Sequence, residues 1–220
     1  MDFIEHLKKS AFGGSLPEGS VADLSGWMDP KFKDVFIEMV HRARAAAPNR
    51  PLIIIEVGTW KGLSAHTMAS ICKAEGIPVR IICIDTWLGA PEFWTWGLND
   101  PMRGKSLKCK AGYPQVYYTF IANMIAEGHQ DVIAPFPISS AEAVAVLEHY
   151  KIRADLIYID AAHEYEAVKA DIARYAVLGD RLFGDDYSDG WPGVKRAVDE
   201  AAAQKTINGV VWTLDFKSPI

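Results

Sequence analysis

The 220-residue sequence has few cysteines, no excess of basic residues and no long apolar run. Its three cysteines, Cys72, Cys83 and Cys109, form no C-x-x-C pair, which argues against a disulfide framework or a zinc site and favours reduced thiols in the cytoplasm. The formal net charge of −5 offers no basic surface to a phosphate backbone, so we expect no nucleic-acid partner. No apolar run is long enough for a membrane span and the acidic start is unlike a signal peptide, so we expect no membrane association.

Half of the residues are hydrophobic, which is ample for the core of a single domain. Along the chain, short apolar runs alternate with segments whose apolar residues recur at helical spacing. The predicted strands are 52–56, 79–85, 132–137, 154–160, 179–184 and 210–216, and the predicted helices are 2–9, 31–47, 64–73, 115–127, 140–150, 164–176 and 193–203. This alternation predicts an α/β fold in which a doubly wound, Rossmann-like and mostly parallel sheet lies between helices, a three-layer sandwich.

Residues 86–113 have little periodicity but contain Trp87, Trp94 and Trp96. Loops of this length in compact domains are typically lids or binding loops, and the tryptophans argue against disorder. We predict a Trp-rich lid insertion here. Its tryptophans, with Trp191, either stack on a sugar or an aromatic ring or pack the lid against the sheet.

The segment from residue 52 to residue 66 combines a buried strand, a turn with two glycines and the start of a helix. This unit places a ligand above the carboxyl edge of a parallel sheet. The candidate binding residues are Glu56, Gly58, Thr59, Gly62 and Ser64. The first tight turn of a dinucleotide fingerprint is missing, and so is the lysine that a phosphate-binding P-loop needs before its serine. An ordinary glycine turn of an α/β protein is the alternative interpretation.

Polar residues also stand where the other predicted strands end, namely Asp85, Ser139, Asp160 and Asp185. All of them would lie along one edge of the sheet. Asp85 is suited to accept hydrogen bonds from two ribose hydroxyls, or else to cap a loop. Ser139 and Ser140 would lie near an adenine ring, or else cap the helix that follows.

Three carboxylates, those of Asp160, Asp185 and Asp186, converge if the fourth and fifth predicted strands are neighbours. Such a group needs a cation, and oxygen ligands favour Mg²⁺, with Mn²⁺ or Ca²⁺ as substitutes. The alternative is that Asp185 and Asp186 only shape a turn. His163 can reach the same edge and act as a general base for a hydroxyl beside the metal, or else cap a helix or bind the metal itself.

From about residue 52 to residue 198, the order of these motifs resembles that of metal-dependent class I S-adenosylmethionine-dependent O-methyltransferases. The chain is most similar to the macrocin-type branch, which acts on sugars of natural products, and more distantly to catechol O-methyltransferase. The matching segments are residues 56–64, 84–85, 159–165 and 184–187, followed by residues 193–194. The tail after the last predicted helix is short for the family, so only one strand is predicted there.

The resemblance implies an S-adenosylmethionine-binding catalytic domain over residues 51–220, after an N-terminal helical cap over residues 1–50. It implies that Glu56 and Gly58 belong to the cofactor loop and that Asp85 binds the ribose. It also implies that Asp160, Asp185 and Asp186 bind the metal, that His163 and Asp160 are catalytic, and that His163 is the general base. The expected reaction is in-line methyl transfer to a hydroxyl of a small molecule, a sugar moiety or a phenolic metabolite.

Two other classes remain open. An NAD-linked oxidoreductase would use the same sheet, although the missing glycine of the fingerprint disfavours it. A non-catalytic module that binds a nucleotide cofactor is disfavoured by the apparently complete set of metal ligands and base. We expect any homo-oligomer to form through the N-terminal helices.

Overall fold

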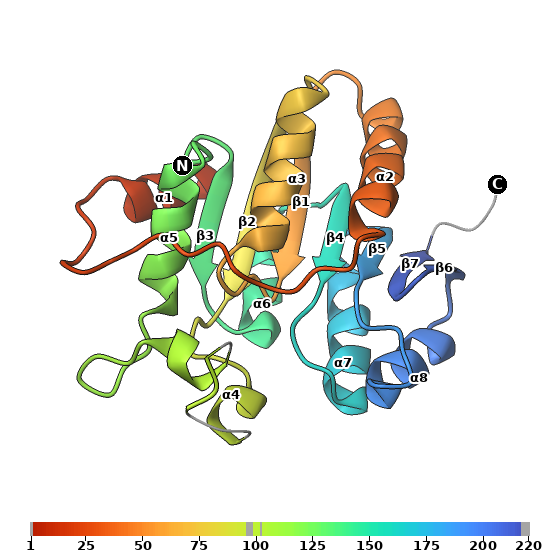
Figure 1. Ribbon diagram of the computed structural model, residues 1–220. Helices are drawn as coiled ribbons and strands as arrows, with labels where there is room; N and C mark the ends of the chain where they lie inside the picture. Colours follow the sequence, from red (N-terminus) through yellow and green to blue (C-terminus); the bar gives the residue numbers. More distant parts are fainter. Residues whose placement is uncertain (1, 96–98, 102, 217–220) are drawn as a thin grey trace.

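The computed structural model describes residues 2–95, 99–101 and 103–216. Within them, the chain forms one seven-stranded sheet in the order β3-β2-β1-β4-β5-β7-β6 (Figure 1). The strands are β1 (Leu52–Val57), β2 (Val79–Asp85), β3 (Ile133–Pro137), β4 (Leu156–Ile159), β5 (Arg181–Gly184), β6 (Gln204–Asn208) and β7 (Val211–Asp215). The first five strands are parallel, and β7 is antiparallel to both β5 and β6. The predicted doubly wound, mostly parallel sheet is therefore confirmed.

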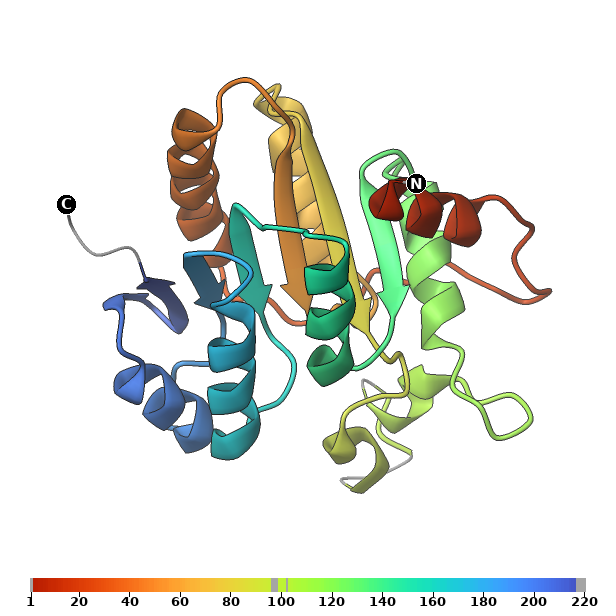
Figure 2. The ribbon, with the colours of Figure 1, turned by 180° about the vertical axis from the view of Figure 1, so that it is seen from behind.

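Helices cover both faces of this sheet. They are α1 (Phe3–Phe12), α2 (Phe32–Ala46), α3 (Leu63–Ala74), α4 (Pro91–Thr95), α5 (Val116–Ala126), α6 (Ser140–His149), α7 (Tyr165–Tyr175) and α8 (Pro192–Glu200), with the 3₁₀ helix η1 (Gly104–Leu107). Helices α2, α3 and α5 pack on the face seen in Figure 1, and α1, α6, α7 and α8 pack on the face seen in Figure 2. The three-layer sandwich is as predicted. In the described part of the chain, no helix has both the length and the apolar character needed to cross a membrane.

The central strand β1 is apolar except at Glu56, as expected for a strand that is buried on both faces. Successive side chains of a strand point to opposite sides, so Ile54 joins the core under α2, α3 and α5 whereas Ile55 joins the core under α1, α6, α7 and α8. Both side chains are completely buried. Continuous burial of this kind is typical of parallel sheets and explains why the strand was recognisable from its sequence.

Both N-terminal helices pack on the sheet with aromatic side chains. On α1, the Phe3 ring stacks on Tyr150 at a centroid distance of 4.3 Å and meets the edge of Phe136 at 5.3 Å. On α2, the Phe32 ring lies 5.0 Å from the ring of Tyr158 in β4. The apolar side chains of these helices are thus used within the chain. A domain boundary at residue 50 and self-association through these helices remain predictions.

The C-terminal hairpin differs from the prediction. A helix was predicted to residue 203 and a single strand after it, whereas α8 ends at Glu200 and two strands, β6 and β7, follow. Strand β6 is a largely exposed edge strand with the polar sequence Gln-Lys-Thr-Ile-Asn, so it has no apolar run to reveal it. Its two-residue turn begins at Gly209, whose φ of 69° suits the first position of a hairpin turn. The Asn208-Gly209 pair, where β6 ends and this turn begins, was the available sequence signal.

The predicted lid insertion contains the short helices α4 and η1. Trp87 is only 2% exposed, and its ring lies 5.0 Å from that of Tyr117 and 5.1 Å from that of Phe120 in α5. Trp87 therefore packs the start of the insertion against the core and is not free to stack on a ligand. Trp94 is 44% exposed. Trp96 lies outside the described residues.

Gly58 permits a close contact between the end of β1 and the chain leaving β4. Its φ is 87°, and a Cβ atom there would lie 2.1 Å from the Asp160 carbonyl oxygen. Gly76, after α3, has a φ of 64° but nothing within 4 Å of its Cβ position.

We expect Gly58→Ala to lower the free energy of unfolding by about 3 kcal/mol or more, and the control Gly76→Ala by about 1 kcal/mol, because only Gly58→Ala adds a backbone collision to the strain. Urea unfolding measures both losses, and equal losses would contradict this account of Gly58.

Candidate active site

A cavity of about 550 Å³ opens at the carboxyl edge of the sheet. Residues at or just after the ends of all five parallel strands line it, among them Gly58, Asp85, Ser139, Asp160 and Asp185. Figure 1 shows these strand ends pointing toward the insertion that carries α4. A volume of this size is typical of small-molecule sites, and the position is where open α/β sheets bind ligands.

Glu56 holds the glycine loop, the turn between β1 and α3, in place. This residue is fully buried, and its carboxylate Oε1 accepts a hydrogen bond from the Ser64 hydroxyl at the start of α3. Burial raises the pKa of Glu56 to about 8, and the hydroxyls of Ser64 and Thr59 oppose that rise. Glu56 therefore fixes the loop between β1 and α3. Of the predicted cofactor residues, those that line the cavity are Gly58, Thr59, Ser64, Asp85, Ser139 and Ser140, whereas Glu56 and Gly62 lie behind its wall.

Asp85 joins the glycine loop to the insertion. Its Oδ2 accepts a hydrogen bond from the Trp60 backbone N–H at 2.8 Å, and its Oδ1 accepts one from the Trp87 N–H at 2.7 Å. The Trp87 indole N–H donates in turn to the Trp60 carbonyl at 2.7 Å. Burial raises the pKa of Asp85, and these backbone hydrogen bonds oppose the rise. The loop-capping alternative is thus observed, and contact of this carboxylate with a ribose stays a prediction.

Ser139 and Ser140 both organise the start of α6. The Ser139 hydroxyl accepts a hydrogen bond from the Glu142 N–H at 3.3 Å and so caps the helix. The Ser140 hydroxyl donates to Asp171 Oδ1 in α7 at 2.9 Å, and the Arg174 guanidinium lies 3.5 Å from the same oxygen. Ser139 is thus the helix cap, where the sequence pointed to Ser140, and contact of either serine with an adenine ring stays a prediction.

The structure groups Asp160, His163 and Asp186, whose potential ligand atoms all lie within 4.8 Å of one another. Asp160 follows β4, and its Oδ2 accepts a hydrogen bond from the Tyr158 hydroxyl at 3.0 Å. Burial, followed by the charges of Asp186 and Asp185, raises the pKa of Asp160 to about 7. A divalent cation would relieve this repulsion, and two carboxylates with an imidazole are an ordinary donor set for one.

Asp185 is oriented differently from the predicted trio. Its Oδ1 accepts a hydrogen bond from the Asp186 N–H at 2.8 Å, and its Oδ2 accepts one from the Asp29 N–H at 3.4 Å. The carboxylate therefore shapes the turn after β5 and holds the chain that precedes α2. His163 takes its place in the converging group of three, a difference that comes from the local backbone and was not visible in the Asp-Asp sequence. Metal binding by any of these residues stays a prediction.

His163 lies between two carboxylates and an indole ring. Its Nε2 is 2.9 Å from Asp186 Oδ2, its Nδ1 is 3.1 Å from Glu92 Oε1, and its ring stacks on Trp191 at 3.9 Å. Burial opposes a charge on this ring, but the hydrogen bond and charge of Asp186, with Glu92 and Asp160, raise the pKa of His163 to about 9. Both ring nitrogens thus lie within hydrogen-bond distance of carboxylates, and these contacts favour the protonated ring.

Glu92 was not singled out from the sequence. It lies on α4 in the predicted lid, 71 residues from His163, and is only 8% exposed. Its Oε2 is buried and has no hydrogen-bond partner among the described residues. The sequence shows Glu92 only as an acidic residue in a Trp-rich insertion. No sequence pattern pairs it with a histidine of a later segment.

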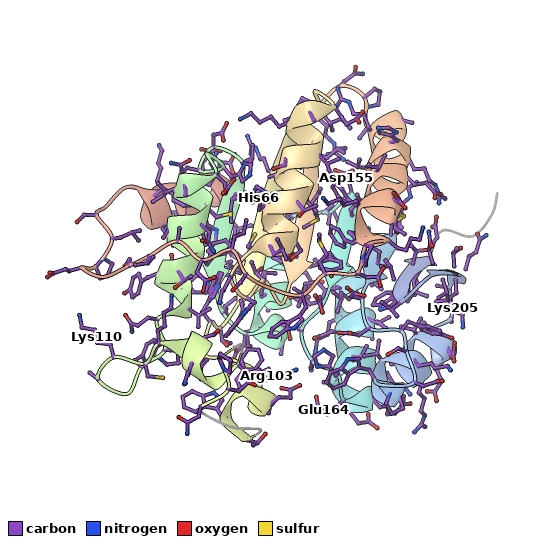
Figure 3. The ribbon with its side chains drawn as sticks, in the orientation of Figure 1. His66, Arg103, Lys110, Asp155, Glu164 and Lys205 are labelled. Atoms are coloured by element: carbon purple, nitrogen blue, oxygen red, sulfur yellow. The ribbon has the colours of Figure 1, made fainter. Side chains whose placement is uncertain are left out.

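The chain between α1 and α2 also contributes to the cavity wall, which the sequence did not reveal. It crosses the carboxyl edge of the sheet (Figure 1), and the buried Lys61 ammonium holds it through Asp23 at 2.8 Å and Ser25 at 2.9 Å. Trp27 lines the cavity, with the Arg103 guanidinium 5.3 Å from its ring centroid. Figure 3 labels Arg103, a residue of the insertion, at this edge. A planar cation and an indole thus stand at one end of the cavity.

The buried Glu56 should make stability depend on pH. Its pKa is raised from an ordinary 4.5 to about 8, so the folded chain keeps a proton that the unfolded chain loses, and stability falls as the pH rises through this range. Between pH 5 and pH 8 we expect the wild type to lose roughly 2–4 kcal/mol more unfolding free energy than Glu56→Gln. Urea unfolding at both pH values tests this, with the exposed Glu38→Gln as a control that should behave like the wild type. Parallel losses in all three proteins would contradict it.

Comparisons with known proteins agree with this geometry. Residues 55–178, more than half of the chain, match the model of a family described as a methyltransferase domain. None of the curated proteins matches significantly. Among solved structures, CalS11, described as a calicheamicin methyltransferase, has a TM-score of 0.58 at 18% identity over 98% of this chain and 91% of that chain. The O-methyltransferase from Bacillus cereus in complex with SAH has a TM-score of 0.52 at 14% identity, again over 98% and 91%.

The family match runs from the second half of β1 to just past α7, and it therefore includes the glycine loop, Asp85 and the Asp160–His163 segment. The solved structures share the order and connection of the layers, at identities that establish the fold alone. The chain thus belongs to the methyltransferase-domain family and has the class I methyltransferase fold.

Proposed function

We propose that the protein is an S-adenosylmethionine-dependent O-methyltransferase that acts on a hydroxyl of a small molecule with the help of a divalent cation. The observation that carries the proposal is the group of Asp160, His163 and Asp186 at the wall of the cavity beside the glycine loop. Family membership supports methyl transfer, and the chemistry of these three side chains supports activation of a hydroxyl.

The residues of the cavity fit S-adenosylmethionine, which would supply an electrophilic methyl group. Asp85 presents a carboxylate already aimed by two backbone N–H groups, which suits a pair of ribose hydroxyls. Gly58, Thr59 and Ser64 offer a wall without bulky side chains above β1. The SAH bound to the Bacillus cereus enzyme of the same fold supports this choice.

Asp160 and Asp186 fit a divalent cation, which would supply positive charge that lowers the pKa of an acceptor hydroxyl. Mg²⁺ is the proposed ion, with Mn²⁺ or Ca²⁺ as substitutes. The carboxylates that would hold it are also those that keep His163 protonated. A cation held there would offset the carboxylate charge that raises the pKa of His163, so the imidazole could take a proton from the acceptor at Nε2, while Glu92 would fix the ring through Nδ1.

The acceptor we propose is a sugar moiety or a phenolic metabolite. Trp27 and Trp191 line the cavity and offer flat apolar surfaces to such rings. CalS11 is described as a TDP-rhamnose 3′-O-methyltransferase, which supports a sugar acceptor on this fold. The predicted lid at residues 86–113 would cover this end of the cavity.

Calorimetry with S-adenosylhomocysteine and with NAD, each with and without Mg²⁺, tests the cofactor. We expect S-adenosylhomocysteine to bind and NAD not to bind, and we expect Asp85→Asn to weaken binding roughly tenfold or more because a charged acceptor is lost. Asp155→Asn, at the opposite end of β4, is the matched control and should bind normally. Equal binding of NAD, or unchanged binding by Asp85→Asn, would argue against the proposed cofactor site.

Removal of the base or of its carboxylate neighbour should separate chemistry from binding. We expect His163→Ala and Asp160→Asn each to reduce turnover by about 100-fold or more, with little change in affinity for S-adenosylhomocysteine. Transfer of a labelled methyl group from S-adenosylmethionine to TDP-rhamnose and to catechol measures turnover. The control His149→Ala, at the end of α6, should keep full activity. Undiminished turnover in either variant would remove that residue from the mechanism.

A further inference from the structure

The insertion carries an excess of positive charge beside the cavity, although the protein has a net charge of −5. Residues 101–126 include no acidic residue, whereas residues 103–110 include Arg103, Lys105, Lys108 and Lys110. The three lysines are exposed and Arg103 is half-buried. Figure 3 shows Arg103 at the carboxyl edge of the sheet and Lys110 farther out on the insertion. The insertion therefore produces a local positive potential that attracts anions to this edge.

Arg103 is held at the entrance of the cavity. Arg103 and Trp27 both line the cavity, and Trp27 is 51% exposed, so the pair lies where the cavity meets solvent. The guanidinium carbon lies 5.3 Å from the centroid of the indole ring, a cation–π contact that restricts the arginine. Lys108 Nζ, 3.9 Å from Asp23 Oδ2, ties the insertion to the segment that carries Trp27. Stacking uses the face of a guanidinium and phosphate recognition uses the N–H groups at its edge, so the two contacts are compatible.

The size of the cavity brings part of an acceptor to this entrance. A volume of about 550 Å³ is typical of a site for one small molecule. Under the proposed function the cofactor and the acceptor share this volume, so the cavity has room for the reacting ring of the acceptor beside His163 and for little more. The remainder of a larger acceptor therefore leaves the cavity past Trp27 and Arg103.

The charges of the cavity wall favour an acceptor whose own negative charge lies at the entrance. Glu92, Asp160 and Asp186 lie around His163, so an anionic group next to this histidine would be repelled. An anionic group at Arg103 is instead attracted by the arginine and by the exposed lysines of the insertion. Several positive charges suit a group with more than one negative charge, and the exposed surface of Trp27 suits a nucleobase.

We infer that the acceptor is a nucleoside diphosphate ester whose diphosphate binds Arg103 while its reacting ring lies beside His163. The inference rests on the proposed function for the reaction, but it concerns a contact outside the reacting group. A nucleotide sugar and a coenzyme A thioester both contain a nucleoside diphosphate, so Arg103 would recognise the chemistry that the two share.

Calorimetry with TDP tests this contact in the full-length protein. Saturating S-adenosylhomocysteine keeps TDP out of the cofactor site, and the absence of Mg²⁺ prevents a cation from bridging the diphosphate to Asp160 and Asp186. We expect TDP to bind the wild type and Arg103→Gln to weaken this binding roughly 10- to 100-fold, because a charge-assisted contact to phosphate is lost. Lys73→Gln, which removes an exposed positive charge from the last turn of α3, is the matched control and should bind TDP normally. Coenzyme A in place of TDP distinguishes the two sources, because the ligand that binds more tightly identifies the class of ester.

Equal affinity of these ligands for the wild type and Arg103→Gln, or no binding of either by the wild type at about 1 mM, would overturn the inference. Uncharged thymidine should show no difference between the two proteins. An equal loss of thymidine and TDP affinity would also overturn the inference, because the substitution would then act through the packing of Trp27 and not through charge. Methyl transfer to catechol by the wild type reports on the proposed function alone, so a failure of that function and a failure of the Arg103 contact are distinguishable.

Discussion

The structure depends on carboxylates that are buried at the ends of parallel strands. Glu56, Asp85 and Asp160 follow or end β1, β2 and β4, and burial is the first cause of the raised pKa of each. Hydrogen-bond donors from loops reduce the free-energy cost of burying these groups. Glu56 accepts a hydrogen bond from the Ser64 hydroxyl, and Asp85 accepts hydrogen bonds from two backbone N–H groups. These carboxyl groups therefore hold the loops at this edge in place, and two of them, those of Asp85 and Asp160, also line the cavity.

Polar contacts across long sequence distances assemble the cavity wall. Lys61 of the glycine loop binds Asp23, Asp185 after β5 accepts a hydrogen bond from Asp29, and Glu92 of the insertion binds His163. Each contact joins a segment outside the sheet to a strand end or to the turn that follows one. The scaffold thus supplies the reacting edge, and the chain before α2 and the insertion complete it.

The sheet, its layers and the edge that carries the site were predictable because buried parallel strands and amphipathic helices leave strong periodic signals. Strand β6 could not be predicted, because an exposed edge strand has no apolar face. The orientation of Asp185 could not be predicted either, because it depends on hydrogen bonds from backbone N–H groups. Tertiary contacts, which the sequence does not reveal, place three further residues at the site: Glu92, Trp27 and Lys61. For Trp87 the sequence allowed two roles, stacking on a ligand or packing the lid against the sheet. Its burial against Phe120 shows that it packs.

The placement of Glu92 has a consequence for the diversity of such enzymes. The side chain that fixes His163 belongs to α4 and not to the strands that carry the other acids. An exchange of this insertion for another one would replace both the surface that meets an acceptor and the partner of the histidine in a single step. Under the proposed function, substrate range and proton transfer would then evolve together, while the sheet and the cofactor loop stay unaltered.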